Sequence, residues 1–116
     1  LLMDRLSIVP ALAPAAPEAL APALRALADP TRLRLLGLLA AGERCVCDLH
    51  EPLGLAQNLV SHHLRVLREA ELVSARRDSR WVHYTLRRDR VEALWDGLLT
   101  LLDAEAASAP PPARCP

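Results

Sequence analysis

The stretch Gln57-Asn58-Leu59-Val60-Ser61-His62-His63-Leu64-Arg65-Val66-Leu67-Arg68 has the spacing of a helix with two chemically different faces. At 100° per residue, one face gathers the apolar side chains together with His63. The opposite face carries polar side chains, namely Asn58, Ser61, His62 and Arg65. Such side chains can bond to base edges and phosphates, and the DNA major groove admits one α-helix. The stretch is therefore either a recognition helix or an ordinary amphipathic surface helix, and its neighbours decide between them.

Three helices are expected before this stretch. Apolar residues at helical spacing predict a first helix over residues 18–28. Asp29 as a cap and Pro30 at the first helical position start a second helix, whose buried stripe we expect at Leu33, Leu36 and Leu39-Ala40. A short third helix over 46–53 should end at Gly54, which suits a left-handed C-cap. Two helices joined by a short turn form a helix-turn-helix, in which the second helix reads DNA.

A β-hairpin is expected directly after the recognition helix. Residues 72–76 and 80–86 alternate with period two, and residues 77–79 read as the turn. The hairpin is basic, with Arg76, Arg77 and Arg80 near its tip. A basic hairpin in this position is typical of a wing that follows the sugar-phosphate backbone.

A last helix is predicted over 90–104, with Asp89 as its cap and a wide apolar stripe that includes Leu94, Trp95 and Leu98. The fold class is therefore mainly α with a β-hairpin wing, a winged helix-turn-helix that dimerises through its first and last helices. We expect a flexible segment at 1–16, the DNA-binding and dimerisation domain at 17–104, and a Pro-rich flexible tail at 105–116.

The charge distribution supports nucleic acid as a partner. The chain has a net charge of zero, but residues 57–90 carry eight Arg against four acidic residues, a net +4. No apolar run reaches the roughly 20 residues of a membrane span, and no signal peptide is evident, so a cytoplasmic protein is expected. The DNA-binding residues that we predict are Gln57, Asn58, Ser61, His62, Arg65, Arg68, Arg76, Arg77 and Arg80.

Four motifs together resemble the ArsR/SmtB family of metal-sensing winged-helix repressors: Ala28-Asp29-Pro30-Thr31-Arg32, Cys45-Val46-Cys47-Asp48-Leu49, Val60-Ser61-His62-His63-Leu64 and Val82-His83-Tyr84. The resemblance covers roughly residues 18–104, and the Cys-Val-Cys-Asp-Leu motif is its most specific part. It implies a homodimer that binds operator DNA, expected to be an inverted repeat, and releases it when metal binds. In the subgroup with this motif, the two cysteines ligate As(III), Sb(III) or soft divalent ions such as Cd(II) and Pb(II).

The thiols fit such a role on physical grounds. Cys45 and Cys47 lie at a predicted helix start, where unpaired N–H groups favour the thiolate, and soft thiolates select soft ions. Residues i and i+2 of a helix point about 200° apart, so joint chelation should require the helix start to loosen. Where many relatives have a third cysteine this chain has His50, which would suit a divalent ion such as Zn(II) better than As(III); Cys115 in the tail is the other candidate ligand.

Other interpretations remain open from the sequence. Cys45 and Cys47 could be partly buried structural thiols, and a rival function is a redox-sensing regulator in which the cysteines form disulfides. A Cys47–His50 dyad lacks a third orienting group, so the sequence favours no enzyme. His63 is expected to form a structural hydrogen bond, and Glu71, where relatives often have Gly, is expected to strain the turn.

Overall fold

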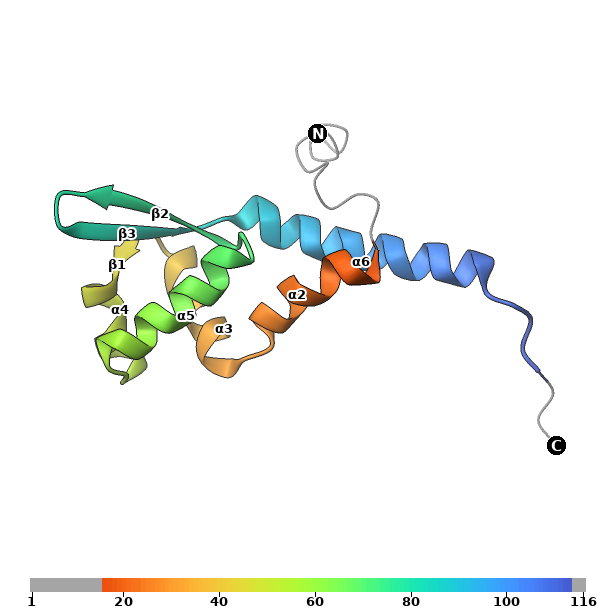
Figure 1. Ribbon diagram of the computed structural model, residues 1–116, viewed down its shortest axis with the longest axis horizontal. Coiled ribbons are helices and arrows are strands. Elements are labelled where there is room, and N and C mark those ends of the chain that lie inside the picture. Colours follow the sequence, from red (N-terminus) through yellow and green to blue (C-terminus); the bar gives the residue numbers. More distant parts are fainter. Residues whose placement is uncertain (1–15, 114–116) are drawn as a thin grey trace.

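A computed structural model describes residues 16–113 (Figure 1). In chain order its elements are α2 (Pro17–Leu27), α3 (Pro30–Ala40), β1 (Arg44–Cys45), α4 (Val46–Leu53), α5 (Gln57–Glu69), β2 (Val73–Asp78), β3 (Trp81–Leu86) and α6 (Arg88–Ser108). This order confirms the winged helix-turn-helix with its hairpin wing. The predicted flexible segment 1–16 falls, apart from its last residue, outside the described residues.

Helix α3 begins as the sequence predicts. The side chain of Asp29 accepts a hydrogen bond from the backbone N–H of Arg32 at 3.0 Å, and Pro30 takes the first helical position. The predicted buried stripe is only partly right. Leu36 and Leu39 are buried together with Leu35, whereas Leu33 is 55% exposed and Ala40 is exposed as well. The prediction for Leu33 was wrong because the core-facing side of the helix is centred on Leu35 and Leu39, which are four residues apart.

The sheet has three antiparallel strands in the order β1-β3-β2. Asp78 still pairs with Trp81, so the turn is shorter than predicted and lies at residues 79–80. Ser79 has a φ of 58°, as two-residue hairpin turns require. Strand β1 was not predicted, because two residues are too short to show period-two alternation. It is defined only by its pairing with β3.

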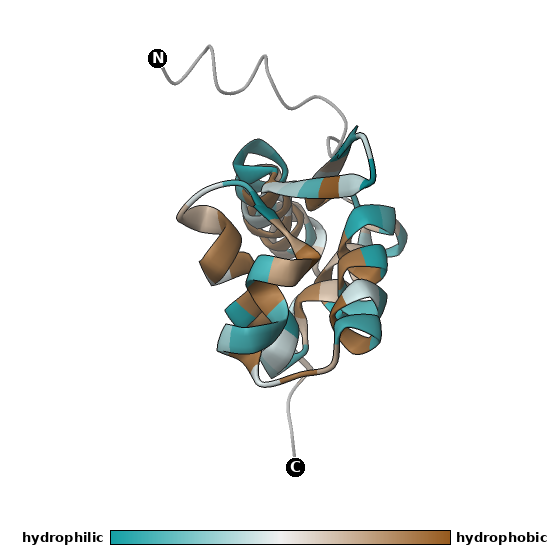
Figure 2. Ribbon diagram, turned by 90° about the vertical axis from the view of Figure 1, so that its left-hand side faces the viewer, coloured by the Kyte–Doolittle hydropathy of each residue, from teal (hydrophilic) through white to brown (hydrophobic). Residues whose placement is uncertain are grey.

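The core is built from leucine and valine side chains. All five described helices contribute to it, and α6 does so through its N-terminal half. The fully buried side chains are Leu20, Leu35, Leu49, Val60, Leu64, Leu67, Leu72, Val73 and Leu94. Figure 2 shows hydrophilic and hydrophobic bands alternating along the helices, which is the pattern of helices with one face on a shared core. Leu72 and Val73 bring the base of the wing into the same core, which fixes the wing relative to α5.

Helix α6 runs beside α2 and continues past it (Figure 1). Its N-cap is Arg87, and Asp89 lies inside its first turn, so Asp89 is not the cap that we predicted. The helix also extends to Ser108, four residues beyond the predicted end and into the segment expected to be a flexible tail. The helix leaves three large apolar side chains exposed, namely Trp95, Leu99 and Leu102.

The turn after α5 adopts the strained conformation that was expected. Glu71 has a φ of 61°, in the left-handed region that favours glycine. Its carboxylate accepts a hydrogen bond from Nη2 of Arg90 at 3.0 Å, which ties this turn to α6.

Candidate functional site

The recognition helix α5 presents the two faces that its sequence predicts. Val60, Leu64 and Leu67 are each 0% exposed and anchor the helix in the core. All of the residues proposed to contact DNA on this helix are exposed: Gln57, Asn58, Ser61, His62, Arg65 and Arg68. The hydrophobic face therefore fixes the helix, and the polar face is available to a ligand.

His63 lies at the edge of the buried face and links α5 to α3. Nη1 of Arg32 donates a hydrogen bond to Nδ1 of His63 at 3.2 Å, which confirms the predicted hydrogen-bonding role of His63. Nε of Arg32 also donates to the carbonyl of Ala26 at 2.6 Å. Burial lowers the pKa of His63, and the charge of Arg32 lowers it further against the opposing effect of Asp29. A neutral imidazole is thereby favoured, and only a neutral imidazole offers Nδ1 as an acceptor.

The turn between α4 and α5 is short and well defined. Gly54 has a φ of 66°, the left-handed conformation predicted for a C-cap glycine. The N–H of Leu55 donates to the carbonyl of His50 at 3.0 Å, which closes the end of α4. Since α5 begins at Gln57, only Leu55 and Ala56 separate the Gly54 C-cap of α4 from the recognition helix.

The wing carries its arginines in unequal environments. Arg76, Arg77 and Arg80 are all exposed, as predicted. Nη2 of Arg76, however, donates to the carboxylate of Glu43 at 2.8 Å, and the hydroxyl of Thr85 donates to the other oxygen at 3.1 Å. The hydrogen bond from Arg76 is the main reason that the pKa of Glu43 is lowered. Sequence reasoning missed Glu43, which offsets one of the three positive charges of the wing.

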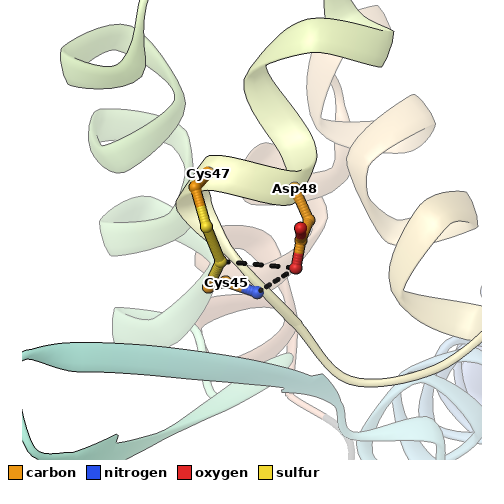
Figure 3. A group of neighbouring side chains, drawn as sticks. All are labelled: Cys45, Cys47 and Asp48. Atoms are coloured by element: carbon orange, nitrogen blue, oxygen red, sulfur yellow. Dashed lines mark hydrogen bonds between the residues drawn. A yellow bond between two sulfur atoms is a disulfide. The ribbon is translucent and has the colours of Figure 1, made fainter.

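Cys45, Cys47 and Asp48 gather at the start of α4 (Figure 3). Their donor atoms all lie within 4.8 Å of one another, with Cys45 buried and the other two exposed. Cys45 is the N-cap, and its backbone N–H donates to Oδ2 of Asp48 at 3.4 Å. Sγ of Cys45 lies 3.3 Å from the same oxygen, and the two cysteines are joined as a disulfide.

The expected loosening of the helix is not needed to bring the two sulfurs together. Residues i and i+2 of a helix point apart, but Cys45 precedes the helix and has extended backbone angles, φ −91° and ψ 169°. The direction of its side chain is therefore not set by the rotation of 100° per residue within a helix. The Cα atoms of Cys45 and Cys47 are 5.4 Å apart. The geometric part of that prediction was wrong because it treated an N-cap as a helical residue.

The predicted further ligands are not part of this cluster. His50 lies on α4 and is half-buried, outside the group of three donors. Cys115 lies outside the described residues. Asp48 was missed as a donor because the sequence reasoning treated the two cysteines alone and did not consider a capping box at this helix start. The capping hydrogen bond turns it back toward Cys45, a capping-box geometry that an acidic residue three positions after the cap can indicate.

The donor set fits a metal ion of borderline softness. Two thiolates and a carboxylate are ligands of Zn(II) and Cd(II), whereas As(III) favours three thiolates, and the described residues supply two. A metal would need the reduced thiolates, because a disulfide sulfur has no charge to offer.

No helix in residues 16–113 is long and apolar enough to cross a membrane.

A helix-turn-helix whose second helix exposes a polar face, followed by a β-hairpin, defines the class of winged helix-turn-helix DNA-binding domains. The model of the bacterial regulatory protein, arsR family, matches residues 29–75. The chain is 35% identical to a solved structure of a possible transcriptional regulator for arsenical resistance, covering 77% of this chain and 97% of that one with a TM-score of 0.63. The chain belongs to the arsR family of DNA-binding regulators.

Two further relatives are informative. The arsenical resistance operon repressor of Escherichia coli is 49% identical over 61 residues, which is 52% of each chain. A homodimeric winged helix-turn-helix DNA-binding domain from Mycobacterium bovis, a possible ArsR-family transcriptional regulator, is 28% identical with a TM-score of 0.62, covering 84% of this chain and 89% of that one. The match spans 53% and 52% of the length of two curated repressors and 64% of a third.

Proposed function

We propose that this chain is a metal-responsive transcriptional repressor that binds operator DNA as a cytoplasmic homodimer and releases it when an ion binds Cys45 and Cys47. The observation that carries the proposal is the donor group at the start of α4, the helix that one short turn joins to the recognition helix. Relatives that are arsenical resistance repressors support the metal-responsive class. The candidate inducers are As(III), Sb(III), Cd(II), Pb(II) and Zn(II), and the two-thiol donor set favours the divalent ions.

The link from ion to DNA runs through the helix cap. Asp48 accepts the N–H of Cys45, so the carboxylate that would bind an ion also holds the first turn of α4. Ligation draws Cys45, Cys47 and Asp48 toward one centre and competes with the cap, whose loss typically costs about 0.5–2 kcal/mol. That range overlaps the usual coupling free energy of about 1–3 kcal/mol between allosteric sites, which corresponds to about 5- to 150-fold in operator affinity.

The exposed apolar surface supports the homodimer. Leu24, Leu27, Val91, Leu94 and Trp95 help to line an open groove of about 360 Å³ between α2 and α6. Trp95 is 63% exposed and Leu102 55%. A contiguous apolar surface of this kind on a small domain usually marks an interface. A symmetric pair would present two recognition helices to successive major grooves, about 34 Å apart, and hence favour an inverted repeat.

The test is operator binding measured by gel shift or fluorescence anisotropy with reduced protein over a salt series and with each candidate ion. The proposal requires binding to an imperfect palindrome at the chain's own promoter, with affinity that falls with salt and with the inducing ion. Failure to bind any such sequence at low salt would overturn it.

A thiol-based redox sensor is the second candidate, and the Cys45–Cys47 disulfide favours it. In this reaction two thiols lose two protons and two electrons to an oxidant such as hydrogen peroxide, which is reduced to two molecules of water. The oxidised pair cannot bind an ion. Release of DNA by peroxide but by none of the ions under reducing conditions would select this function over metal sensing.

A further inference from the structure

The short strand β1 places a thiol and an imidazole in the same row of the sheet. β1 pairs antiparallel with β3, with Cys45 opposite His83 and Arg44 opposite Tyr84. Directly opposite residues of an antiparallel pair point to the same face, with Cβ atoms about 4.5–5.5 Å apart. His83 is therefore a direct neighbour of the buried cysteine, although the two lie 38 residues apart in the sequence.

Contacts along the same face support this placement. One more step of the register sets Glu43 opposite Thr85, and the hydroxyl of Thr85 donates to the carboxylate of Glu43 at 3.1 Å. His83 and Thr85 are two residues apart on one strand and share a face. The imidazole thus lies on the face shared by Glu43 and Cys45.

We propose that His83 of the wing is a further ligand of the ion held by Cys45, Cys47 and Asp48. This inference rests on the proposed function, since it requires that Cys45 and Cys47 bind metal, and it deepens it by naming the ion class. Two thiolates, a carboxylate and an imidazole form a four-ligand set suited to a tetrahedral Zn(II) or Cd(II). The same set is unsuited to As(III), because it offers two thiolates.

The distances allow this arrangement. The donor atoms of Cys45, Cys47 and Asp48 already lie within 4.8 Å of one another, and the imidazole stands outside that group. Zn–S and Zn–N bonds of about 2.3 and 2.0–2.1 Å can join side chains whose Cβ atoms are about 5 Å apart. A rotation of the half-buried His83 side chain, with no change of register, completes the site.

The consequence is that an ion would connect the wing to the recognition unit. His83 belongs to β3, and Cys47 and Asp48 belong to α4, which leads directly into α5. His83 also stands opposite Arg76 of β2, the arginine that Glu43 holds. Ligation by His83 therefore acts on both DNA-contacting parts, whereas ligation by His50 would stay within α4.

The test measures the Zn(II) affinity of the reduced full chain by competition with a chromophoric chelator. It compares the wild type with three variants, His83→Gln, His50→Gln and Cys47→Ser. We expect His83→Gln to weaken Zn(II) binding at least about tenfold and His50→Gln to leave it within twofold. On the wild type, stoichiometric Zn(II) should shift the imidazole ¹⁵N resonances of His83 and leave those of His50 in place. This second readout does not depend on the folding of any variant.

The outcomes separate the two proposals. If Cys47→Ser loses Zn(II) affinity while His83→Gln binds as the wild type does and its ¹⁵N resonances stay still, His83 is not a ligand and the metal-sensing function stands. If Cys47→Ser also binds as the wild type does, the site at Cys45 and Cys47 is wrong, and the inference fails with it.

Discussion

The carboxylate of Asp48 accepts the backbone N–H of Cys45 at 3.4 Å, so a candidate metal ligand also completes the capping box of the helix that precedes the recognition helix. Cys45 in turn pairs with His83 across the sheet. The start of α4 therefore takes part in three features at once: the capping box, the donor group and, through Cys45, the pairing with the wing.

Replacing Asp48 should separate capping from ligation. Asp48→Ala removes the acceptor for the Cys45 N–H and should lower the free energy of unfolding by about 0.5–2 kcal/mol. Asp48→Asn retains an oxygen acceptor and should be close to wild type in stability, yet bind Zn(II) more weakly because it lacks the negative charge. Thermal unfolding and chelator competition measure the two effects. Equal Zn(II) affinity in both variants and the wild type would remove Asp48 from the site.

Stability should fall in mild acid because of His63. Burial holds its folded pKa below the usual 6.5, so below pH 6.5 the unfolded chain takes up a proton that the folded chain resists. The contribution of His63 is thus fully present above pH 6.5 and is lost as the pH falls through its folded pKa. Urea unfolding between pH 7.5 and 5 should show a steeper loss for the wild type than for His63→Gln, which can still accept from Arg32. Parallel pH profiles for the two proteins would contradict this assignment.

On the recognition helix, Arg65→Ala should weaken binding to the operator by about 1–3 kcal/mol and affect unrelated DNA much less. Arg65 is exposed on the face opposite Val60, Leu64 and Leu67, so the substitution should leave the core unchanged. Competition binding with specific and random duplexes gives the two affinities. An equal loss on both duplexes would mean that Arg65 contacts only phosphate.

Arg76 and Arg77 form a matched pair in the wing. Arg77→Ala should weaken binding to all sequences and reduce the slope of log K against log salt by about 0.9, as expected for one phosphate contact. Arg76→Ala should change the slope less, because Glu43 holds Arg76 at 2.8 Å and offsets its charge. If the two substitutions lower the slope equally, the Glu43 pairing does not persist on DNA.

Trp95→Glu should shift the chain toward monomer. Trp95 is 63% exposed beside the groove between α2 and α6. A buried tryptophan at an interface is often worth about 2 kcal/mol or more, or about 30-fold in dimer dissociation. Leu33→Glu, at a comparably exposed leucine on α3, is the control and should leave dimerisation unchanged. Sedimentation equilibrium distinguishes the two, and a dimer that tolerates Trp95→Glu would place the interface elsewhere.

Much of the fold could be predicted from the sequence because its signals are local. The buried face of α5, the Asp29 cap and the Gly54 turn each follow from spacing or backbone preference, and each is observed. Leu33 was misplaced because helical spacing alone does not say which of two neighbouring stripes meets the core. The exposure of the predicted DNA-contacting residues is observed, but their contact with DNA stays a prediction.

The donor group was harder to predict. The cysteine motif is visible in the sequence, but the positions of its partners depend on tertiary contacts. Asp48 is brought in by a capping hydrogen bond, and His83 by the register of a two-residue strand that has no sequence signature. A cross-strand neighbour 38 residues away cannot be found from local spacing.

The central claim is that an ion at Cys45 and Cys47 weakens operator binding. The most direct test titrates the complex of reduced protein and operator DNA with Zn(II), Cd(II) and As(III) and measures the operator affinity. The account predicts a loss of affinity within about 5- to 150-fold for the wild type with its inducing ion. Cys45→Ser and Cys47→Ser should each bind the operator as the wild type does without metal and remain bound when the ion is added. Release of both variants at the ion concentration that releases the wild type would contradict the account.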